Sequence, residues 1–92
     1  PAVERDLAMV LAKNITYEQV EQTVLQAKVK RLKNIALFDV FESEKLGTDK
    51  KSIALNFVFQ DAEKTLTDTE TDKMMSQIMT QLEKELSAEI RK

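Results

Sequence analysis

The chain has 92 residues and carries 14 basic against 16 acidic side chains, for a net charge of −2. It contains no cysteine and no histidine, which excludes disulfides, thiolate metal sites and cysteine nucleophiles, and removes the commonest general base of enzymes. Free-standing nucleic-acid-binding domains usually have a basic surface, so any nucleic-acid binding would take its positive charge from a local patch or from a larger assembly.

The length accommodates one domain with a modest hydrophobic core, and we expect residues 1–92 to form a single domain. No apolar stretch approaches the ~20 residues of a membrane span. The chain begins with Pro1 and shows no signal-peptide pattern. We therefore expect a fragment of a longer, cytoplasmic protein, which the absence of cysteine also favours.

The first part of the chain predicts a strand, a helix and a second strand. Residues 5–12 alternate and are rich in leucine, methionine and valine, which is typical of a strand. Residues 16–19 read Thr-Tyr-Glu-Gln and fit a capping box, so a helix begins here, with Ile15 packing against Val20. Residues 35–42 predict the second strand.

The second part predicts a hairpin, a long helix and a short last strand. Residues 44–51 are polar and contain the only glycine, Gly47, which predicts a hairpin loop. Residues 52–60 alternate strictly, with these apolar side chains on one side: Ile53, Leu55, Phe57 and Phe59. Residues 67–70 form a second capping box, and residues 88–91 predict a final strand. The helix between them carries an apolar stripe that includes Met74, Ile78 and Leu82.

The order strand, helix, strand, strand, helix, strand is the split βαβ, or ferredoxin-like, pattern (βαββαβ) of an α+β domain. In this arrangement two helices cover one face of an antiparallel sheet, and the other face is open. The sequence shows no internal repeat and no low-complexity tract. We therefore look for a binding site on the open face.

The second predicted strand carries an aspartate at its centre. A mid-strand carboxylate is costly in a core unless it is paired, so we expect Asp39 to face outward, with Leu37 and Phe41 on the same side by the period of two. Phe38 and Val40 then point toward the helices. On the other strands the expected outward residues are Asp6, Ala8, Val10, Ser52, Ala54 and Asn56.

Asp39 and Phe41 are a candidate base-recognition pair. A carboxylate can accept the N1 and N2 protons of guanine, and an aromatic ring can stack on an unpaired base, with about 1–3 kcal/mol per stacked base. Both residues also have simpler explanations. Phe41 is compatible with packing at the rim of a core, and Asp39 with a charge that prevents pairing at a sheet edge.

The sequence also contains two groups of basic residues. Lys50 and Lys51, near Lys45 in the predicted hairpin loop, are candidates for RNA backbone contacts, although a solvated basic loop explains them equally well. A second group follows the first helix and suits the dipole at its C-terminus: Lys28, Lys30, Arg31 and Lys33.

Three motifs occur in order along the chain. They are Pro1 with Arg5-Asp6-Leu7, then Leu37-Phe38-Asp39-Val40-Phe41, then Lys50-Lys51-Ser52 followed by Phe59-Gln60-Asp61 and Thr65-Leu66-Thr67-Asp68. In this order and spacing the chain resembles the ferredoxin-fold anticodon-binding domain at the C-terminus of bacterial phenylalanyl-tRNA synthetase beta chains. The resemblance covers nearly the whole chain, and it implies an open face similar to that of RNA-recognition motifs.

The resemblance also implies roles for individual residues. Ala8, Asp39, Phe41 and Ser52 match the anticodon-facing positions of the family. Asp39 would accept hydrogen bonds from a guanine at the first anticodon position, and Phe41 would stack on a base. Ala8 would leave room, and the Ser52 hydroxyl would donate or accept a hydrogen bond. No catalytic residue and no metal ligand is implied in this domain.

The implied partners are the anticodon stem-loop of the phenylalanine tRNA and the rest of a synthetase. That parent is an (αβ)2 heterotetramer of beta and alpha chains, and it joins phenylalanine to its tRNA with ATP and magnesium. Those cofactors belong to other domains, so we expect no cofactor here, and neither DNA nor a membrane as a partner.

The sequence departs from the family at two places. Family members often carry tyrosine where this chain has Phe41, so a phenol hydrogen bond is lost. Many also carry glycines after the first helix, where this chain has Lys28-Val29-Lys30, which predicts a longer first helix here.

Two other functions fit the same fold. An acylphosphatase-like enzyme needs a phosphate-cradling loop after the first strand, usually with glycine, and Lys13-Asn14-Ile15 contains none. A protein-docking module within a larger assembly fits better, and it would have its open face covered by another domain rather than by RNA.

Overall fold

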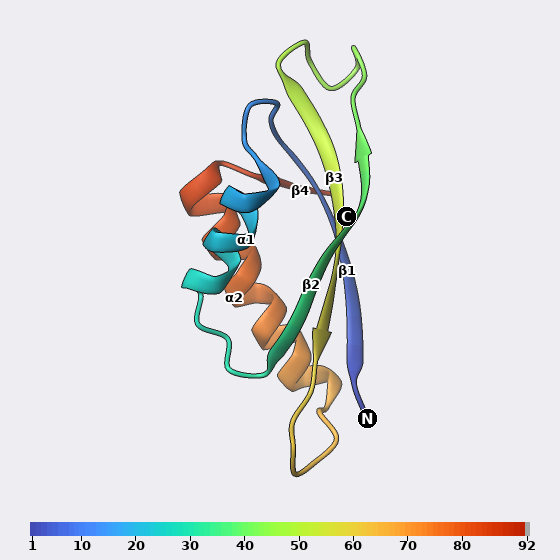
Figure 1. Cartoon of the computed structure of the whole chain (residues 1–92), viewed down its shortest axis with the longest axis vertical. Helices are drawn as coiled ribbons and strands as arrows, with labels where there is room; N and C mark the ends of the chain where they lie inside the picture. Colours follow the sequence, from blue (N-terminus) through green and yellow to red (C-terminus); the bar gives the residue numbers. More distant parts are fainter. Residues whose placement is uncertain (92) are drawn as a thin grey trace.

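A computed structural model describes residues 1–91, which form a four-stranded antiparallel sheet with both helices on one face (Figure 1). Along the chain the elements are β1 (Val3–Ala12), α1 (Tyr17–Gln26), β2 (Leu32–Phe41), β3 (Lys50–Phe59), α2 (Asp68–Leu86) and β4 (Glu89–Arg91). The strands lie side by side in the order β2-β3-β1-β4. The predicted ferredoxin-like α+β fold is confirmed.

Both helices begin with the predicted capping boxes. At α1 the Thr16 hydroxyl accepts a hydrogen bond from the Gln19 N–H (3.1 Å), and the Gln19 side chain accepts from the Thr16 N–H (2.8 Å). At α2 the same reciprocal pair joins Thr67 and Glu70, at 3.1 Å each way. These bonds satisfy backbone donors that the first helical turn leaves without partners, so short local patterns suffice to position both helix starts.

The core lies between the sheet and the helices. Alternate residues of β1 and β3 supply the sheet side: Leu7, Met9, Leu11, Ile53, Leu55, Phe57 and Phe59. The helices supply Val20, Val24, Met74, Met75, Ile78 and Leu82. The strict alternation of β3 therefore buries one side of the strand, as predicted, and leaves the other side for the open face.

The strands β2 and β3 start earlier than predicted. β2 begins at Leu32, and β3 begins at Lys50. Lys50 and Lys51 therefore lie in β3 and not in the hairpin loop, which corrects their predicted location. The last strand has three residues and begins at Glu89.

The first helix does not run longer, contrary to our expectation. α1 ends at Gln26, Ala27 caps it, and Lys28 adopts a positive φ of 54°. Glycine is favoured in this left-handed conformation because it has no Cβ. Lys28 therefore occupies a glycine-type conformation without a glycine.

A β-bulge in β2 overturns the predicted orientation of two residues. Leu37 pairs with Leu55, and Asp39 pairs with Ala54, so Phe38 is an extra residue between them. Leu37 therefore lies on the helix-covered face with Leu55, where it remains 36% exposed at the edge of the sheet. Phe38 is 57% exposed and is not packed under the helices as predicted. The bulge breaks the period of two on which the prediction relied.

The strained turn after α1 yields a prediction about stability. We expect Lys28→Gly to stabilise the fold by about 0.5–1 kcal/mol, because glycine adopts the left-handed conformation without the steric penalty of a Cβ. Urea denaturation followed by circular dichroism measures the change. Lys30→Gly, at an exposed position of the same loop for which no positive φ is recorded, is the matched control and should not stabilise. Equal effects of the two changes would contradict the explanation.

The bulge yields a second prediction. Leu37 lines a small cavity of about 30 Å³ together with Tyr17 and Val20 of α1. We expect Leu37→Asp to destabilise the fold by about 2 kcal/mol, because it places an unpaired carboxylate against apolar side chains. Phe38→Asp should change the stability by less than about 0.5 kcal/mol. The reverse ranking in a denaturation experiment would mean that β2 has no bulge at Phe38.

Candidate nucleic-acid interface

The open face is organised in rows that run across the strands. Residues directly opposite on antiparallel strands project to the same face. One row, here called the alanine row, contains Asp39 of β2, Ala54 of β3, Ala8 of β1 and Arg91 of β4. Neighbouring strands lie about 4.8 Å apart, so the row is about 14 Å long. A carboxylate and a guanidinium thus stand at opposite ends of a floor of two small side chains.

The next row, here called the serine row, contains Phe41, Ser52, Val10 and Glu89 in the same strand order. Phe41 is 54% exposed although it is a large apolar residue. Ser52 lies beside it and is only 9% exposed, so little of its hydroxyl reaches the surface. The serine row therefore presents an aromatic ring at the edge strand.

The four residues that the family resemblance implied come together in these two rows. Asp39 and Ala8 lie in the alanine row, and Phe41 and Ser52 lie in the serine row. Asp39 and Phe41 are two residues apart on one strand and on one face, which corresponds to about 7 Å. The orientation predicted for both, outward on an edge strand, is confirmed by their partners Ala54 and Ser52 on the open face.

The two candidate lysines lie on opposite faces of β3. Lys50 pairs with Ala12 on the open face, one position beyond the serine row, and is exposed. Lys51 pairs with Leu11 on the helix side, where its ammonium donates to the Ile15 carbonyl oxygen at 2.6 Å. Only Lys50 therefore lies on the same face as Asp39 and Phe41, one row beyond Phe41, whereas Lys51 holds the segment before α1.

Arg91 is a residue of this surface that the sequence reasoning did not select. It pairs with Ala8 and ends the alanine row on the side opposite Asp39. The βαββαβ order places the last strand next to the first one, so alternation along the last strand could have indicated that Arg91 faces outward. A strand of three residues carries too little periodicity to show which side chain faces outward.

A third row continues the face beyond Asp39. This asparagine row contains Ala36, Asn56 and Asp6. The Asn56 amide donates to a carboxylate oxygen of Asp6 at 2.9 Å. A polar pair with a defined orientation thus lies in the middle of the sheet, next to the two alanines of the alanine row.

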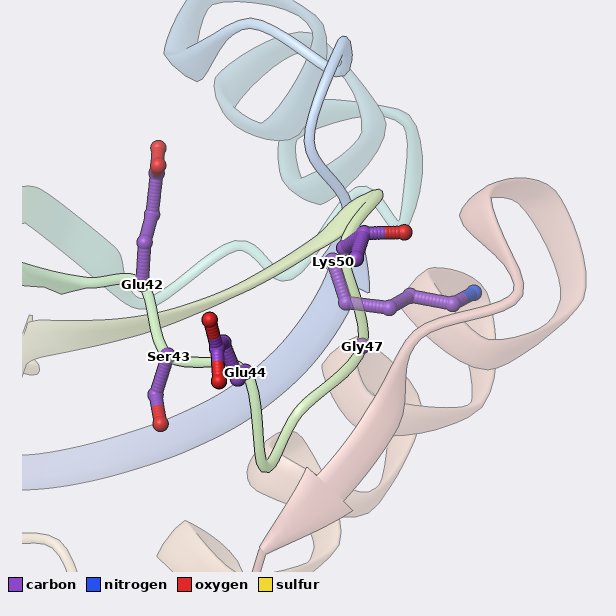
Figure 2. A pocket seen from close by; sticks show the side chains of 6 residues that line it. Glu42, Ser43, Glu44, Gly47 and Lys50 are labelled. Carbon is purple, nitrogen blue, oxygen red and sulfur yellow. The ribbon is translucent and has the colours of Figure 1, made fainter.

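A hollow of about 340 Å³ lies in the loop between β2 and β3, lined by Glu42, Ser43, Glu44, Gly47, Thr48 and Lys50. Figure 2 shows that the labelled side chains of Glu42, Ser43 and Lys50 point away from one another. They do not converge on a point where a ligand atom would be held. The hollow is therefore a feature of the loop and not a ligand pocket.

Two further findings describe what residues 1–91 lack. No group of three or more acidic, histidine or cysteine side chains in this part of the chain has the arrangement of a metal site. Neither helix, within the same range, is long and apolar enough to cross a membrane.

The shortest ion pairs recorded for residues 1–91 involve the β3–α2 connection and lie apart from the rows. The hydrogen bond between Arg31 and Asp61, 2.6 Å long, raises the pKa of Arg31 and lowers the pKa of Asp61. The hydrogen bond from Lys64, at 2.7 Å, and those from Thr67 lower the pKa of Glu70 to about 2. The first pair ties the connection to the turn before β2, and the second ties it to the start of α2, so both have a structural role.

Residues 1–91 match the family model described as the ferredoxin-fold anticodon binding domain, so the chain belongs to this family. It is 45% identical over 91 residues to the phenylalanine–tRNA ligase beta subunit of Streptococcus pneumoniae. It is 43% identical to that of Streptococcus thermophilus and 42% identical to that of Bacteroides fragilis. The alignments cover 99% of this chain but only 11% of each relative.

Membership of the family confirms the resemblance and identifies the class of protein. The chain is a ferredoxin-fold anticodon-binding domain. The family membership favours this function over the acylphosphatase-like alternative. The roles predicted for Ala8, Asp39, Phe41, Ser52 and Lys50 stay predictions, now with a common location.

The capping carboxylate yields a prediction about pH. The folded state lowers the pKa of Glu70 from 4.5 to about 2, so its stabilising effect is complete above about pH 4.5 and is lost as the pH falls toward 2. Glu70→Gln keeps the capping oxygen but does not titrate. We expect the stability of the wild type to fall toward that of the variant between about pH 4.5 and about pH 2, measured by urea denaturation.

The control is Glu83→Gln, an exposed glutamate of the same helix outside the ion pairs recorded for residues 1–91. Its difference from the wild type should change little over this range. A wild-type curve parallel to that of Glu70→Gln would show that the carboxylate is not stabilised in the folded state.

Proposed function

We propose that the open face binds the anticodon stem-loop of phenylalanine tRNA and reads the guanine at the first anticodon position. The observation that carries the proposal is the convergence of Ala8, Asp39, Phe41 and Ser52 in two adjacent rows on the open face. The family resemblance implies that these four positions face the anticodon. The proposed role is to position the tRNA for aminoacylation elsewhere in the parent protein.

Asp39 reads the base through two hydrogen bonds. Its carboxylate accepts from the N1–H and N2–H of guanine, which no other RNA base offers side by side. The side chain is exposed and projects over the same face as Ala54 and Ala8. These two small residues leave room for a flat base over the open face of the sheet. Phe41, about 7 Å along the same strand, stacks on an unpaired base of the loop.

Two cations flank the bases. Arg91 ends the alanine row, and Lys50 lies beyond the serine row. Each can neutralise a phosphate of the single strand, which contributes a slope of about −0.7 to the logarithmic salt dependence of binding. Two such contacts are few, so specificity comes mainly from base recognition. The net charge of −2 gives the isolated chain little general attraction to RNA.

The proposal extends to the parent protein. The relatives are named phenylalanine–tRNA ligase beta subunits, and this chain covers 11% of their length. We propose that the chain is part of such a subunit in the cytoplasm, joined to an alpha chain in an (αβ)2 heterotetramer. ATP, magnesium and phenylalanine are then bound by other parts of that assembly.

A second function, docking onto another protein domain, is favoured by one observation. Phe38 and Phe41 are 57% and 54% exposed on the edge strand. Exposed apolar residues in a group often mark contact surfaces. If docking were the function of this surface, tRNA affinity would not depend on Asp39 or Phe41.

The test is an NMR titration of the labelled chain with the anticodon stem-loop. We expect guanine-dependent shifts at Ala8, Asp39, Phe41 and Ser52. Phe41→Ala should weaken binding by about 1–3 kcal/mol through lost stacking. Asp39→Asn should remove the preference for guanine at the first anticodon position, because an amide replaces one of the two acceptors with a donor.

Phe38→Ala is the matched control, since it removes an equally exposed phenylalanine from the same strand but not from the serine row. It should leave RNA affinity unchanged. Equal affinities of the wild type, Asp39→Asn and Phe41→Ala for the stem-loop would contradict the proposal and favour docking.

A further inference from the structure

We infer that the turn between α1 and β2 binds the phosphate backbone of a double-stranded RNA stem, when the loop of the same RNA lies over Asp39. This turn, here called the basic turn, comprises residues 28–33, which read Lys-Val-Lys-Arg-Leu-Lys. The inference rests on the proposed function and adds a contact region outside the rows of the open face. It is carried by three exposed lysines that take part in no ion pair recorded for residues 1–91: Lys28, Lys30 and Lys33.

The basic turn concentrates positive charge in a chain whose net charge is −2. Four of its six residues are cations and none is acidic. Arg31 alone among them has a partner in the ion pairs recorded for residues 1–91, the Asp61 carboxylate at 2.6 Å. The adjoining β3–α2 connection adds only one further acid, Glu63. The lysines are therefore in excess, and their charges are available to an anionic ligand.

The backbone of the basic turn is fixed by polar and apolar contacts. The Gln60 N–H donates to the Arg31 carbonyl oxygen at 2.9 Å, next to the ion pair with Asp61. Val29 and Leu32, which alternate with the cations, pack against the core. Side chains on an ordered backbone lose less conformational entropy on binding, so the lysines form a platform that is in place before RNA binds.

Lys28 keeps its side chain at a cost to stability. Its positive φ of 54° favours glycine, and backbone strain of this kind collects at functional sites. The dipole of α1 also attracts a cation here, but that effect falls off within the last turn of a helix. It explains neither Lys30 nor Lys33, which lie further along the chain, Lys33 already within β2.

The register gives the distance between the basic turn and the proposed guanine site. Asp39 pairs with Ala54. Asn34, directly after the basic turn, pairs with Val58, four residues further along β3. Four residues of a strand span about 14 Å. The stem then begins a few nucleotides from the bound guanine, on the side away from Phe41.

The opposite end of β2 has no such excess of positive charge. The basic turn and the loop between β2 and β3 lie at opposite ends of the sheet (Figure 1). Residues 42–49 of that loop include three acids and one lysine. Lys50, and Lys13 in its 3.2 Å ion pair with Glu42, only balance these acids. Carboxylates repel phosphates, so the charge distribution directs the stem toward the basic turn.

The chemistry of the basic turn fits a stem and not a base. It contains no aromatic and no amide side chain, and the guanidinium of Arg31 is held by Asp61. The lysine ammonium groups bind phosphate as point charges. Double-stranded RNA is recognised mainly through its shape and its phosphate and 2′-hydroxyl groups. The basic turn would thus add affinity without adding sequence specificity.

The experiment compares two RNAs by NMR titration of the labelled chain at several salt concentrations. They are the anticodon stem-loop and a single-stranded oligonucleotide with the loop sequence alone. We expect the double variant Lys30→Ala, Lys33→Ala to bind the stem-loop about ten-fold more weakly at low salt, and to reduce the slope of log K against log[salt] by about 2. Its affinity for the oligonucleotide should equal that of the wild type. Lys28→Gly should also weaken stem-loop binding, although it stabilises the fold.

The double variant Lys73→Ala, Lys84→Ala is the matched control, because it removes the same charge from exposed positions of α2. It should leave the difference between the two RNAs unchanged. Stem-loop binding that keeps its affinity and salt dependence in Lys30→Ala, Lys33→Ala would overturn the inference, and so would an equal loss for both RNAs. Either result leaves the role proposed for Asp39 in place. Absence of shifts with both RNAs in the wild type, at the highest RNA concentration that stays in solution, would instead overturn the proposed function, and the inference with it.

Discussion

The pairing of β3 with both of its neighbours is the constraint on which the rest of the structure depends. This central strand pairs with β1 from Lys50 to Phe59 and with β2 over most of its length. Its apolar residues form the floor of the core, and the residues between them form the open face. A slip of one residue would exchange the two faces. The register that builds the core is thus the same register that brings Asp39 next to Ala54 and Phe41 next to Ser52.

The bulge at Phe38 allows β2 to place an apolar side chain on the core face and a carboxylate on the open face. In a regular strand Leu37 and Asp39 would share a face, and one of them would be in the wrong environment, since a carboxylate is costly in the core. The extra residue places Leu37 opposite Leu55 and Asp39 opposite Ala54. Bulges are frequent on edge strands and beside functional sites because they redirect side chains. An edge with a bulge also pairs poorly with another strand, which keeps the rim beside the open face free of unwanted partners.

Local patterns in the sequence predicted the parts of the fold that depend on neighbouring residues. The capping boxes at Thr16 and Thr67 and the alternation of β3 are of this kind, and they sufficed for the element order. The remaining features depend on contacts that are distant in the sequence. Phe38 is a bulge residue because its two neighbours pair with consecutive residues of β3. Lys51 donates a hydrogen bond on the helix side to the carbonyl oxygen of Ile15, which is 36 residues earlier in the chain. The open-face location of Arg91 required the three-residue strand β4 to be aligned with β1.

The charge of the domain is consistent with recognition by shape and hydrogen bonding. Asp39, Asp6 and Glu89 place carboxylates on the open face, against the cations Arg91 and Lys50. Carboxylates repel nearby phosphates, so the role proposed for Asp39 has an electrostatic cost, and a net charge of −2 does not offset it. Side chains on paired strands compensate in another way. Their backbone is already ordered before binding, so less conformational entropy is lost when a base is bound. A small acidic domain can therefore contribute base specificity, while most contacts to the RNA backbone are left to other surfaces of a larger protein.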